Sequence, residues 1–439
     1  MSSSSNRIDP SAKPDSTELT SPRRRSALKA AGGIALASLL PASMARAASG
    51  GTLKIGFVSP QTGPLAVFAE SDAFTIAQVK RAVGGGLKLG GRSYALEIIY
   101  KDSQSNSNRA SDAASELILQ DRVDLVLAAS TPATTIPVAD QCELNGVPCI
   151  TTDTPWQPYF FGRKGDPKKG FEWTYHFFWG LEDVIGTYTS MWGQLPTNRE
   201  VGSLWPNDSD GNAWGDPKMG FPPVLANKGF KLVDRGRFQL PSDNFSAYIT
   251  DFRKHNVEIV TGVVPPPDFA NFWSQAGQQG LKPKIVTVAK ATEFPAAVEA
   301  FGDRANGLSV EVWWSPAYPF HSSLTAQSSA QLAAAYSKAA GRPWTMPLGF
   351  RHSLFEVAID VLKRATDRHP EAIRNAIRST SLNTVVGPID FRKGPVPNIA
   401  KTPLTGGQWR KAGKGFELLL VDNSQATMVP VHDKLVMMS

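Results

Sequence analysis

The stretch Val123-Asp-Leu-Val-Leu-Ala-Ala-Ser-Thr-Pro-Ala-Thr134 shows the kind of unit from which this chain is built. Its beginning, 123–129, is a short apolar run, which is typical of a β-strand buried on both faces of a parallel sheet. A brief polar loop follows, and residues 133–144 have the apolar spacing of a helix. A buried strand, a loop and a helix in succession indicate an α/β protein with parallel strands.

The same unit recurs on both sides of this stretch. Further strands are predicted where short apolar runs end in turn residues, at 53–58, 94–100, 147–151, 201–205, 230–239, 257–264, 284–288 and 308–314. Helices are predicted at 65–83, 106–120, 181–192, 213–228, 245–255, 268–278, 325–340 and 350–368. The tail, 384–439, has the pattern of short strands and turns. Two successive α/β units predict two Rossmann-like lobes, each a parallel-type sheet flanked by helices.

The composition fits an ordinary globular protein, with 41% hydrophobic and 19% charged residues among 439. The formal net charge is +7, but the first 47 residues hold seven Lys or Arg against three acidic residues, so the remainder carries +3. No basic stripe of the kind that nucleic-acid binding requires stands out in the sequence. We therefore expect no nucleic-acid partner.

The first 47 residues have the layout of a signal peptide. A polar lead-in precedes Arg24-Arg25-Ser-Ala-Leu-Lys29, an apolar run covers 27–40, and Ala45-Arg-Ala47 offers a small-residue cleavage site. The paired arginines resemble a twin-arginine export motif, and an ordinary secretory signal with an extra arginine is the alternative. No later segment reaches the length of a membrane-spanning apolar run. We expect an exported, soluble, periplasmic protein whose mature chain begins near Ala48.

The cysteines and acidic motifs predict no metal centre. Cys142 and Cys149 are the two cysteines, and they form either a short helix-to-strand disulfide or two buried thiols. Neither has the spacing of a zinc site. The stretch Asp208-Ser-Asp-Gly-Asn212 begins like a calcium loop, but Ala213 stands where glycine is needed and Met219 where glutamate is needed. We interpret it as a polar turn before a helix.

Enzyme motifs are missing from the sequence as well. There is no G-x-G-x-x-G, no C-x-x-C, no G-x-S-x-G and no H-E-x-x-H pattern. Hydroxyl groups without a neighbouring histidine base make a poor nucleophile site. We therefore expect no catalytic residue and no cofactor, and a periplasmic enzyme is the alternative from another class.

Polar loops follow the predicted strands of the first lobe. They are 59–63, 130–134 and 151–155, and each is rich in hydroxyl or turn residues and precedes a helix. In open parallel sheets, ligands bind beyond the carboxyl ends of the strands, and helix N-termini favour a carboxylate. Ser, Thr and Asp also occur in such loops simply as helix caps. Three loops of this kind at one sheet edge favour a binding site.

Five stretches resemble a known family when they are taken in order. They are Ile55-Gly-Phe-Val-Ser-Pro-Gln-Thr-Gly-Pro64, 123–130, Asn145-Gly-Val-Pro-Cys-Ile150, Gln275-Ala-Gly-Gln-Gln-Gly-Leu281 and Thr384-Val-Val-Gly-Pro-Ile-Asp-Phe391. They resemble the branched-chain amino acid, amide and aromatic-acid binding proteins of ABC importers, which have the type I periplasmic binding fold. The resemblance spans about residues 50–400.

The resemblance implies a domain arrangement. Three hinge strands would cross between the lobes near residues 175, 312 and 385. After a signal peptide at 1–47, lobe 1 would comprise 48–175 and about 313–384. Lobe 2 would comprise 176–312 and about 385–439.

The resemblance also implies a set of ligand-binding residues. A solute carboxylate would lie on the hydroxyl and N–H groups of the third and fourth strand loops, and Phe68 would form an aromatic wall. Trp214 would cap the solute from the other lobe, and Trp156 is one of several tryptophans crowding these loops. The loop positions are Thr131, Ala133, Thr134, Thr152 and Thr154.

Lys290 departs from the family pattern. Amino-acid binders of this family keep an acidic residue there to pair with the ligand's ammonium, and Glu293 comes three positions later. A lysine would repel an ammonium and favour an anion, so we expect a carboxylate or aromatic-acid ligand.

The implied partners are a small organic solute and an ABC permease in the inner membrane, with the protein acting as a monomer. The same fold also serves receptors that report ligand occupancy to a membrane signalling protein, and fold alone does not separate the two roles.

Overall fold

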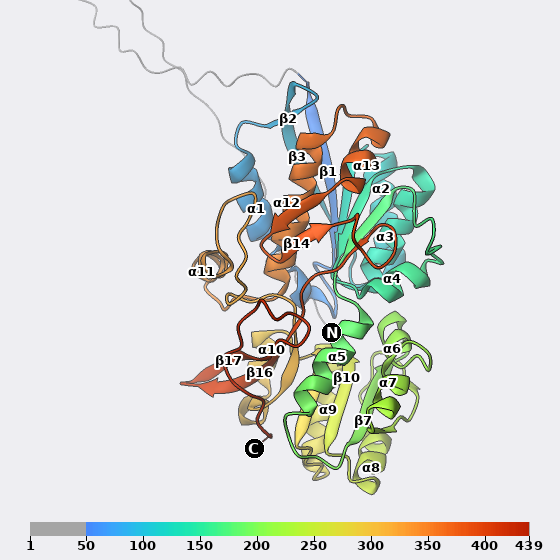
Figure 1. Cartoon of the computed structure of the whole chain (residues 1–439), viewed down its shortest axis with the longest axis vertical. Helices are drawn as coiled ribbons and strands as arrows, with labels where there is room; N and C mark the ends of the chain where they lie inside the picture. The colour runs from blue at the N-terminus through green and yellow to red at the C-terminus, as the bar shows by residue number, and fades with distance from the viewer. Residues whose placement is uncertain (1–49, 439) are drawn as a thin grey trace, which may run out of the picture. The chain divides into compact units, whose positions relative to one another are not determined.

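The structure, a computed structural model, describes residues 50–438 (Figure 1). The predicted signal peptide, 1–47, therefore lies outside the described residues. Among the helices described, none is long and apolar enough to cross a membrane.

The first lobe is built on a sheet of seven strands within the described chain, in the order β15-β6-β5-β4-β1-β3-β2. Its strands are parallel except β2, which forms a hairpin with β3. All five residues of β4 are buried, as its continuous apolar run predicts. The strands are β1 (Thr52–Ser59), β2 (Leu87–Leu89), β3 (Arg92–Asp102), β4 (Leu125–Ala129), β5 (Cys149–Thr152), β6 (Thr174–Phe177) and β15 (Ile399–Ala400).

Helices cover both faces of this sheet. Val126 and Ala128 of β4 pack with α2 and α3, whereas Leu125 and Leu127 pack on the opposite face, with α1 and α12. Figure 1 shows these helix pairs on either side of the strands. The helices are α1 (Asp72–Val83), α2 (Ser107–Leu119), α3 (Pro132–Asn145), α4 (Trp156–Gly162), α11 (Ser329–Ala340), α12 (Pro347–Arg364) and α13 (Pro370–Arg378).

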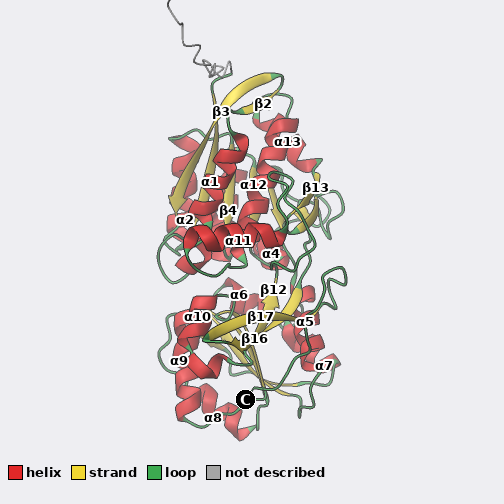
Figure 2. Cartoon of the chain, turned by 90° about the vertical axis from the view of Figure 1, so that its left-hand side faces the viewer, coloured by secondary structure: helices red, strands yellow, loops and turns green. Residues whose placement is uncertain are grey.

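The second lobe repeats this plan around β17-β16-β12-β11-β10-β7-β8, with β9 pairing beside β7. Its strands are parallel except β16 and β17, which run antiparallel at one edge, and helices lie on both sides (Figure 2). The strands are β7 (Glu200–Pro206), β8 (Lys231–Val233), β9 (Arg237–Phe238), β10 (Ile259–Val264), β11 (Ile285–Lys290), β12 (Ser309–Val312), β16 (Thr405–Ala412) and β17 (Gly415–Asp422). The helices are α5 (Leu181–Trp192), α6 (Ser209–Trp214), α7 (Phe221–Asn227), α8 (Ser246–Lys254), α9 (Pro266–Gln278) and α10 (Pro295–Ala300). The predicted fold class of two α/β lobes is confirmed.

Local signals account for several helix ends. The Asn106 side chain caps α2 by accepting from the backbone N–H groups of Asn108 and Arg109 at 2.9 and 3.1 Å. The single helix predicted at 213–228 is instead two helices, α6 and α7. Asp216 accepts hydrogen bonds from two backbone N–H groups of the intervening turn, and that turn interrupts the helical path.

The chain passes between the lobes three times. It does so between β6 and α5, after β12, and between β15 and β16. The third passage was expected near residue 385, but residues 399–400 still pair with β6 in the first sheet. The crossing therefore falls at 401–404, and the first lobe extends to residue 400. A two-residue strand is too short to be recognised from an apolar pattern, which explains the difference.

The two cysteines are free thiols in the structure. Cys142 near the end of α3 and Cys149 at the start of β5 are both buried among alanine and valine side chains. The disulfide that the sequence allowed is not formed, and the alternative of two buried thiols is the one observed. Burial is the largest cause that raises the pKa of Cys142, which disfavours its thiolate.

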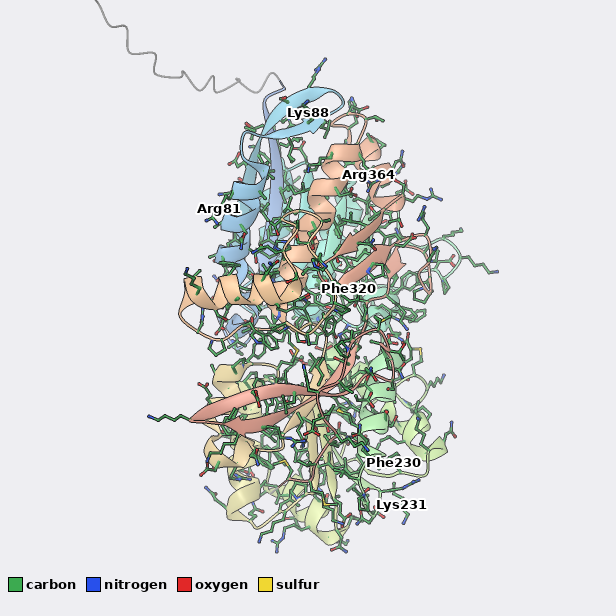
Figure 3. All side chains as sticks on the ribbon, turned by 60° about the vertical axis from the view of Figure 1, so that its left-hand side comes forward. Arg81, Lys88, Phe230, Lys231, Phe320 and Arg364 are labelled. Atoms are coloured by element: carbon green, nitrogen blue, oxygen red, sulfur yellow. The ribbon has the colours of Figure 1, made fainter. Side chains whose placement is uncertain are left out.

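Many basic side chains lie on the outside of the lobes. Arg81, Lys88, Lys231 and Arg364 are exposed (Figure 3). Solvent screens such charges, so their contribution to a buried site is small. The positive charge that matters for a ligand is therefore carried by the few buried cations.

Candidate functional site

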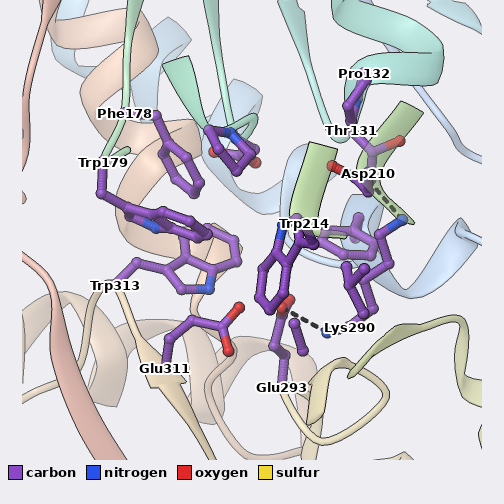
Figure 4. A pocket seen from close by; sticks show the side chains of 15 residues that line it. Thr131, Pro132, Phe178, Trp179, Asp210, Trp214, Lys290, Glu293, Glu311 and Trp313 are labelled. Atoms are coloured by element: carbon purple, nitrogen blue, oxygen red, sulfur yellow. Dashed lines mark hydrogen bonds and ion pairs between the residues drawn. The ribbon is translucent and has the colours of Figure 1, made fainter. Parts of the chain in front are cut away.

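The carboxyl ends of β4 and β5 in the first lobe and of β10 and β11 in the second border one cavity (Figure 4). Its volume is about 30 Å³, enough for a few water molecules. The lining combines aromatic, acidic and small residues: Phe68, Thr131, Pro132, Asp153, Pro155, Phe178, Trp179, Asp210, Trp214, Val263, Ala289, Lys290, Glu293, Glu311 and Trp313.

Aromatic rings form much of the wall. Phe178 packs against Trp179 and Trp313 with ring centroids 4.7 and 5.3 Å apart, and Trp214 stacks on Phe221 at 5.1 Å. The indole N–H groups of Trp179, Trp214 and Trp313 have no hydrogen-bond partner. Buried indole N–H groups usually find an acceptor, so these three donors are available to a solute.

Lys290 ends β11 and is paired with acidic residues of the second lobe. Its Nζ lies 2.6 Å from Asp210 Oδ2 (Figure 4). The same atom lies 3.5 Å from Asp208 Oδ2. Burial alone would lower the pKa of Lys290, but the two carboxylates raise it above its ordinary value. The charge of this lysine is thus already balanced within the protein, which weakens its expected role as an anion-binding group.

Asp208 also has a structural role. Its side chain caps α6 by accepting from the Gly211 backbone N–H at 2.7 Å. The polar stretch 208–212 is therefore the start of α6, and Asp210 in its first turn points to Lys290. Among the described residues, no group of acidic, histidine or cysteine side chains is arranged to hold a metal ion.

A pair of glutamates lies beside Lys290. Glu293 Oε1 accepts from the Lys290 backbone N–H at 2.8 Å, and the Tyr188 hydroxyl donates to Glu311 Oε2. Glu293 and Glu311 both line the cavity, and Glu293 Oε2 has no hydrogen-bond partner. Burial raises the pKa of Glu293 to about 7 and, together with the neighbouring Glu293 charge, raises that of Glu311 as well. Burial therefore disfavours the ionised form of both carboxyl groups.

In the first lobe, Arg351 forms hydrogen bonds to residues of the cavity wall. It lies on α12, is completely buried, and its Nε donates to Asp72 Oδ1 at 2.8 Å. Its other nitrogens donate to Asp153 Oδ2, to Ser130 Oγ and, at 3.0 Å, to the Phe68 carbonyl oxygen. The guanidinium thereby fixes Phe68 and Asp153, which both line the cavity.

Sequence reasoning did not identify Arg351. The signal that was available is an arginine that follows Pro347-Leu-Gly-Phe350 in a helix that is otherwise buried along most of its length. A charged residue in such a position must have partners, because an unpaired buried charge is very costly. The sequence could not show which acids those partners are.

Left-handed backbone conformations occur at the same strand ends. Ser130, Thr131, Asp153 and Lys290 have φ values of 61°, 51°, 64° and 63°, a region that non-glycine residues rarely occupy. Such conformations persist only where surrounding contacts hold them, and they cluster at functional sites. Their position around the cavity supports its assignment as the binding site.

Four of the residues singled out from the sequence line the cavity: Phe68, Thr131, Trp214 and Lys290. Ala133 is half-buried in the first turn of α3 and is not among the lining residues. Trp156 lies next to the lining residue Pro155, and its Nε1 donates to Glu182 Oε1 at 3.1 Å.

The three remaining threonines are engaged within the first lobe. Thr134 Oγ1 lies 3.0 Å from Ser103 Oγ, and Thr154 Oγ1 lies 2.9 Å from Thr135 Oγ1. Thr152 Oγ1 donates to the Phe177 carbonyl oxygen at 2.8 Å. These hydroxyl groups connect strands and helices, and none of the three residues lines the cavity.

Comparison with known proteins places this arrangement in context. The sequence model of the family described as periplasmic binding protein matches residues 52–414. A leucine-binding protein from Thermotoga maritima is similar in structure, with a TM-score of 0.66 at 18% identity over 83% of this chain and 97% of that one.

Two further solved structures have the same fold. One is a solute-binding protein of an ABC transporter from Rhodopseudomonas palustris in complex with 3,4-dihydroxybenzoic acid, with a TM-score of 0.68, 18% identity and coverage of 87% and 98%. The other is a branched-chain amino acid transporter substrate-binding protein from Streptococcus pneumoniae in complex with isoleucine. Its TM-score is 0.64, with 14% identity and coverage of 84% and 99%.

Proposed function

Because the chain belongs to the periplasmic binding protein family, we propose that it is the substrate-binding component of an ABC importer for a small organic solute. The observation that carries this proposal is the cavity at the carboxyl ends of both sheets, with unpartnered polar atoms in its wall. These atoms include Asp153 Oδ1, Glu293 Oε2 and three indole N–H groups. Buried groups of this kind are normally satisfied, so a solute is their natural partner.

Binding in this proposal is coupled to movement of the lobes. A cavity of about 30 Å³ is far smaller than the roughly 300 Å³ of a typical small-molecule site, so the solute enters when the lobes separate. Thr131 and Asp153 belong to the first lobe, whereas Trp214 and Lys290 belong to the second. A solute that contacts both sets favours the closed form, and the closed form docks on the permease in the inner membrane.

The cavity chemistry suits binding better than catalysis. Its lining contains no serine, cysteine or histidine, the residues that supply most nucleophile–base pairs. Family membership likewise points to a solute-binding protein rather than an enzyme. We further propose that residues 1–47 direct export to the periplasm, where the protein acts as a monomer.

The test combines binding with uptake. Residues 48–439 would be purified and screened by thermal shift against amino acids, amines, amides and aromatic acids. A solute at about 100 times its Kd stabilises the folded state by roughly 2.7 kcal/mol, which raises the melting temperature measurably. Deletion of the gene should then abolish uptake of that solute. Binding without any loss of uptake would contradict the transport role, and the absence of a ligand in the screen would count against solute binding.

A further inference from the structure

A further pocket opens on the surface of the first lobe, and it shares no lining residue with the cavity between the lobes. Its volume is about 610 Å³, within the range of roughly 300–1,000 Å³ that is usual for small-molecule sites. Its walls come from the turn at 167–172, strand β6, helix α13 and the loop at 391–398. The pocket is therefore large enough for a ligand of its own.

Positive charge predominates in the lining of this pocket. Four basic residues against one acidic residue, Glu172, give the lining a formal charge of +3. The whole chain after residue 47 carries the same formal charge, so its excess of positive charge is matched at this one place. A concave surface lined by one sign of charge attracts ions of the opposite sign. The basic residues are Lys169, Arg374, Arg378 and Arg392.

Two of the four cations have acidic partners. Arg374 pairs with Glu172, and Arg392 Nη2 lies 2.7 Å from Asp390 Oδ2. The Glu172 side chain is 64% exposed, so solvent screens its attraction for Arg374. An anion inside the pocket can therefore contact Arg374 beside Glu172 or in its place.

The other two cations, Lys169 and Arg378, form no ion pair within residues 50–438. Both are exposed and belong to the pocket wall, so a ligand in the pocket contacts them directly. Arg378 lies four positions after Arg374 on α13, and like charges at this spacing repel each other. Burial raises the pKa of Tyr175 to about 12, and the charges of Arg378 and Arg374 oppose that rise. Both arginines therefore act on the same wall of the pocket, and an anion between them would relieve their repulsion.

Hydrogen bonds and close packing hold the walls in place. The Asn398 side chain accepts from the Phe171 backbone N–H at 2.9 Å and donates to the Phe171 carbonyl oxygen at 3.0 Å, which joins the two loops. A Cβ atom at Gly394 would lie 1.5 Å from the Ile399 carbonyl oxygen, so the second loop closes this tightly only with glycine. A site whose walls are already in place loses less entropy when a ligand binds.

We propose that this pocket binds a free, small organic anion with two or more negative charges, carried by carboxylate or phosphate groups. The guanidinium groups of Arg374 and Arg378 present paired N–H donors that match the oxygens of carboxylate and phosphate. The carbon body of the anion would lie against Tyr175 and Phe391, whose rings line the pocket with centroids 5.2 Å apart. Because the pocket is separate from the cavity between the lobes, the protein binds this anion in addition to its solute.

The first experiment titrates the purified protein with matched anions at equal ionic strength. Phthalate, citrate and pyrophosphate would be compared with benzoate and acetate by calorimetry. The expected result is one site per chain for the multivalent anions, with a Kd of about 1 mM or lower, and at least about tenfold weaker binding of the monovalent anions. The absence of binding by all three multivalent anions would overturn the proposal.

Variants locate the bound anion. Arg378→Gln and Lys169→Gln each remove an exposed, unpaired charge, so the protein should fold normally and bind the best anion about tenfold more weakly. Arg81→Gln, on the exposed side of α1, is the matched control and should keep the affinity of the unmodified chain. Equal affinity in all of these proteins would show that the anion binds elsewhere, for example beside Lys290, and would overturn the proposal.

A sedimentation experiment separates a free anion from the headgroup of an anionic lipid. The protein would be mixed with vesicles of phosphatidylcholine, with and without phosphatidylglycerol. Protein that stays in the supernatant with both kinds of vesicle, together with binding of the free anions, is the expected result. Sedimentation with the phosphatidylglycerol vesicles that is lost in Arg378→Gln, without binding of any free anion, would overturn the proposal in favour of a membrane surface.

Discussion

The two lobes hold their buried cations in different ways. In the first lobe, the Arg351 guanidinium makes four hydrogen bonds, to two carboxylates, a hydroxyl and a carbonyl oxygen. In the second, the Lys290 ammonium contacts two carboxylates, whereas the nearby Glu293 and Glu311 form no ion pair within residues 50–438. A planar guanidinium fixes its partners in direction, whereas an ammonium acts as a point charge. The first lobe therefore presents a rigid wall, and the second contains the groups whose protonation can change.

The largest expected effect on stability comes from removing the Arg351 guanidinium of the first lobe. Arg351→Met removes the partner of Asp72 and Asp153 and leaves two buried carboxyl groups without a cation. Removing one partner of a buried ion pair typically costs about 3–5 kcal/mol, so the free energy of unfolding should fall by that amount. Urea unfolding of the ligand-free protein measures it.

The control for this prediction is Arg81→Met, because Arg81 is exposed on α1 and a surface change should stay within about 0.5 kcal/mol. Equal stability of Arg351→Met and the unmodified chain would show that the two acids simply take up protons. In that case, the difference drawn between the lobes would not hold.

The second prediction concerns the buried carboxyl group of Glu293 in the second lobe. Burial raises the pKa of Glu293 from its ordinary 4.5 to about 7, so its proton is bound more tightly in the folded protein than in the unfolded chain. The proton on Glu293 therefore stabilises the folded state. This contribution to the free energy of unfolding is complete below about pH 4.5 and is lost as the pH rises through about 7, a decrease of about 3 kcal/mol. Thermal unfolding of the ligand-free protein between about pH 5 and about pH 8 should show the decline.

Glu293→Gln sharpens this prediction, because an amide does not titrate and can still accept from the Lys290 backbone N–H. The variant should lose much of the pH dependence, while Glu417→Gln, on an exposed position of β17, should retain it. A pH dependence that is the same in all three proteins would place the titrating group elsewhere.

The architecture was largely predictable from the sequence, because apolar runs and helical spacing are local signals. The runs at 53–58 and 123–129 mark β1 and β4, and strand ends of a parallel sheet locate the site without any knowledge of side-chain direction. The short strand β15 carries no such pattern, which is why the third passage between lobes was misplaced.

The chemistry of the site was less predictable, because it depends on contacts between distant parts of the chain. Arg351 meets Asp153 although 198 positions separate them. Lys290 attracts attention in the sequence as a free cation, but folding brings Asp210 to it. Two of the three hydroxyl-rich loops, 130–134 and 151–155, contribute residues to the cavity lining, and the direction of each threonine is set by neighbouring strands and helices.

The smallest expected effect concerns Thr134, whose hydroxyl group is directed by contacts within the first lobe. Thr134→Val keeps the size of the side chain and removes the hydroxyl that lies 3.0 Å from Ser103 Oγ. Loss of one buried hydrogen bond should cost about 1 kcal/mol of stability. Because Thr134 does not line the cavity, the Kd for the solute should change less than about twofold, or under roughly 0.4 kcal/mol. Thermal unfolding and calorimetric titration measure the two effects separately. A much weaker Kd with little loss of stability would instead mean that Thr134 turns toward the solute in the bound form, so that part of the first-lobe wall rearranges when the lobes close.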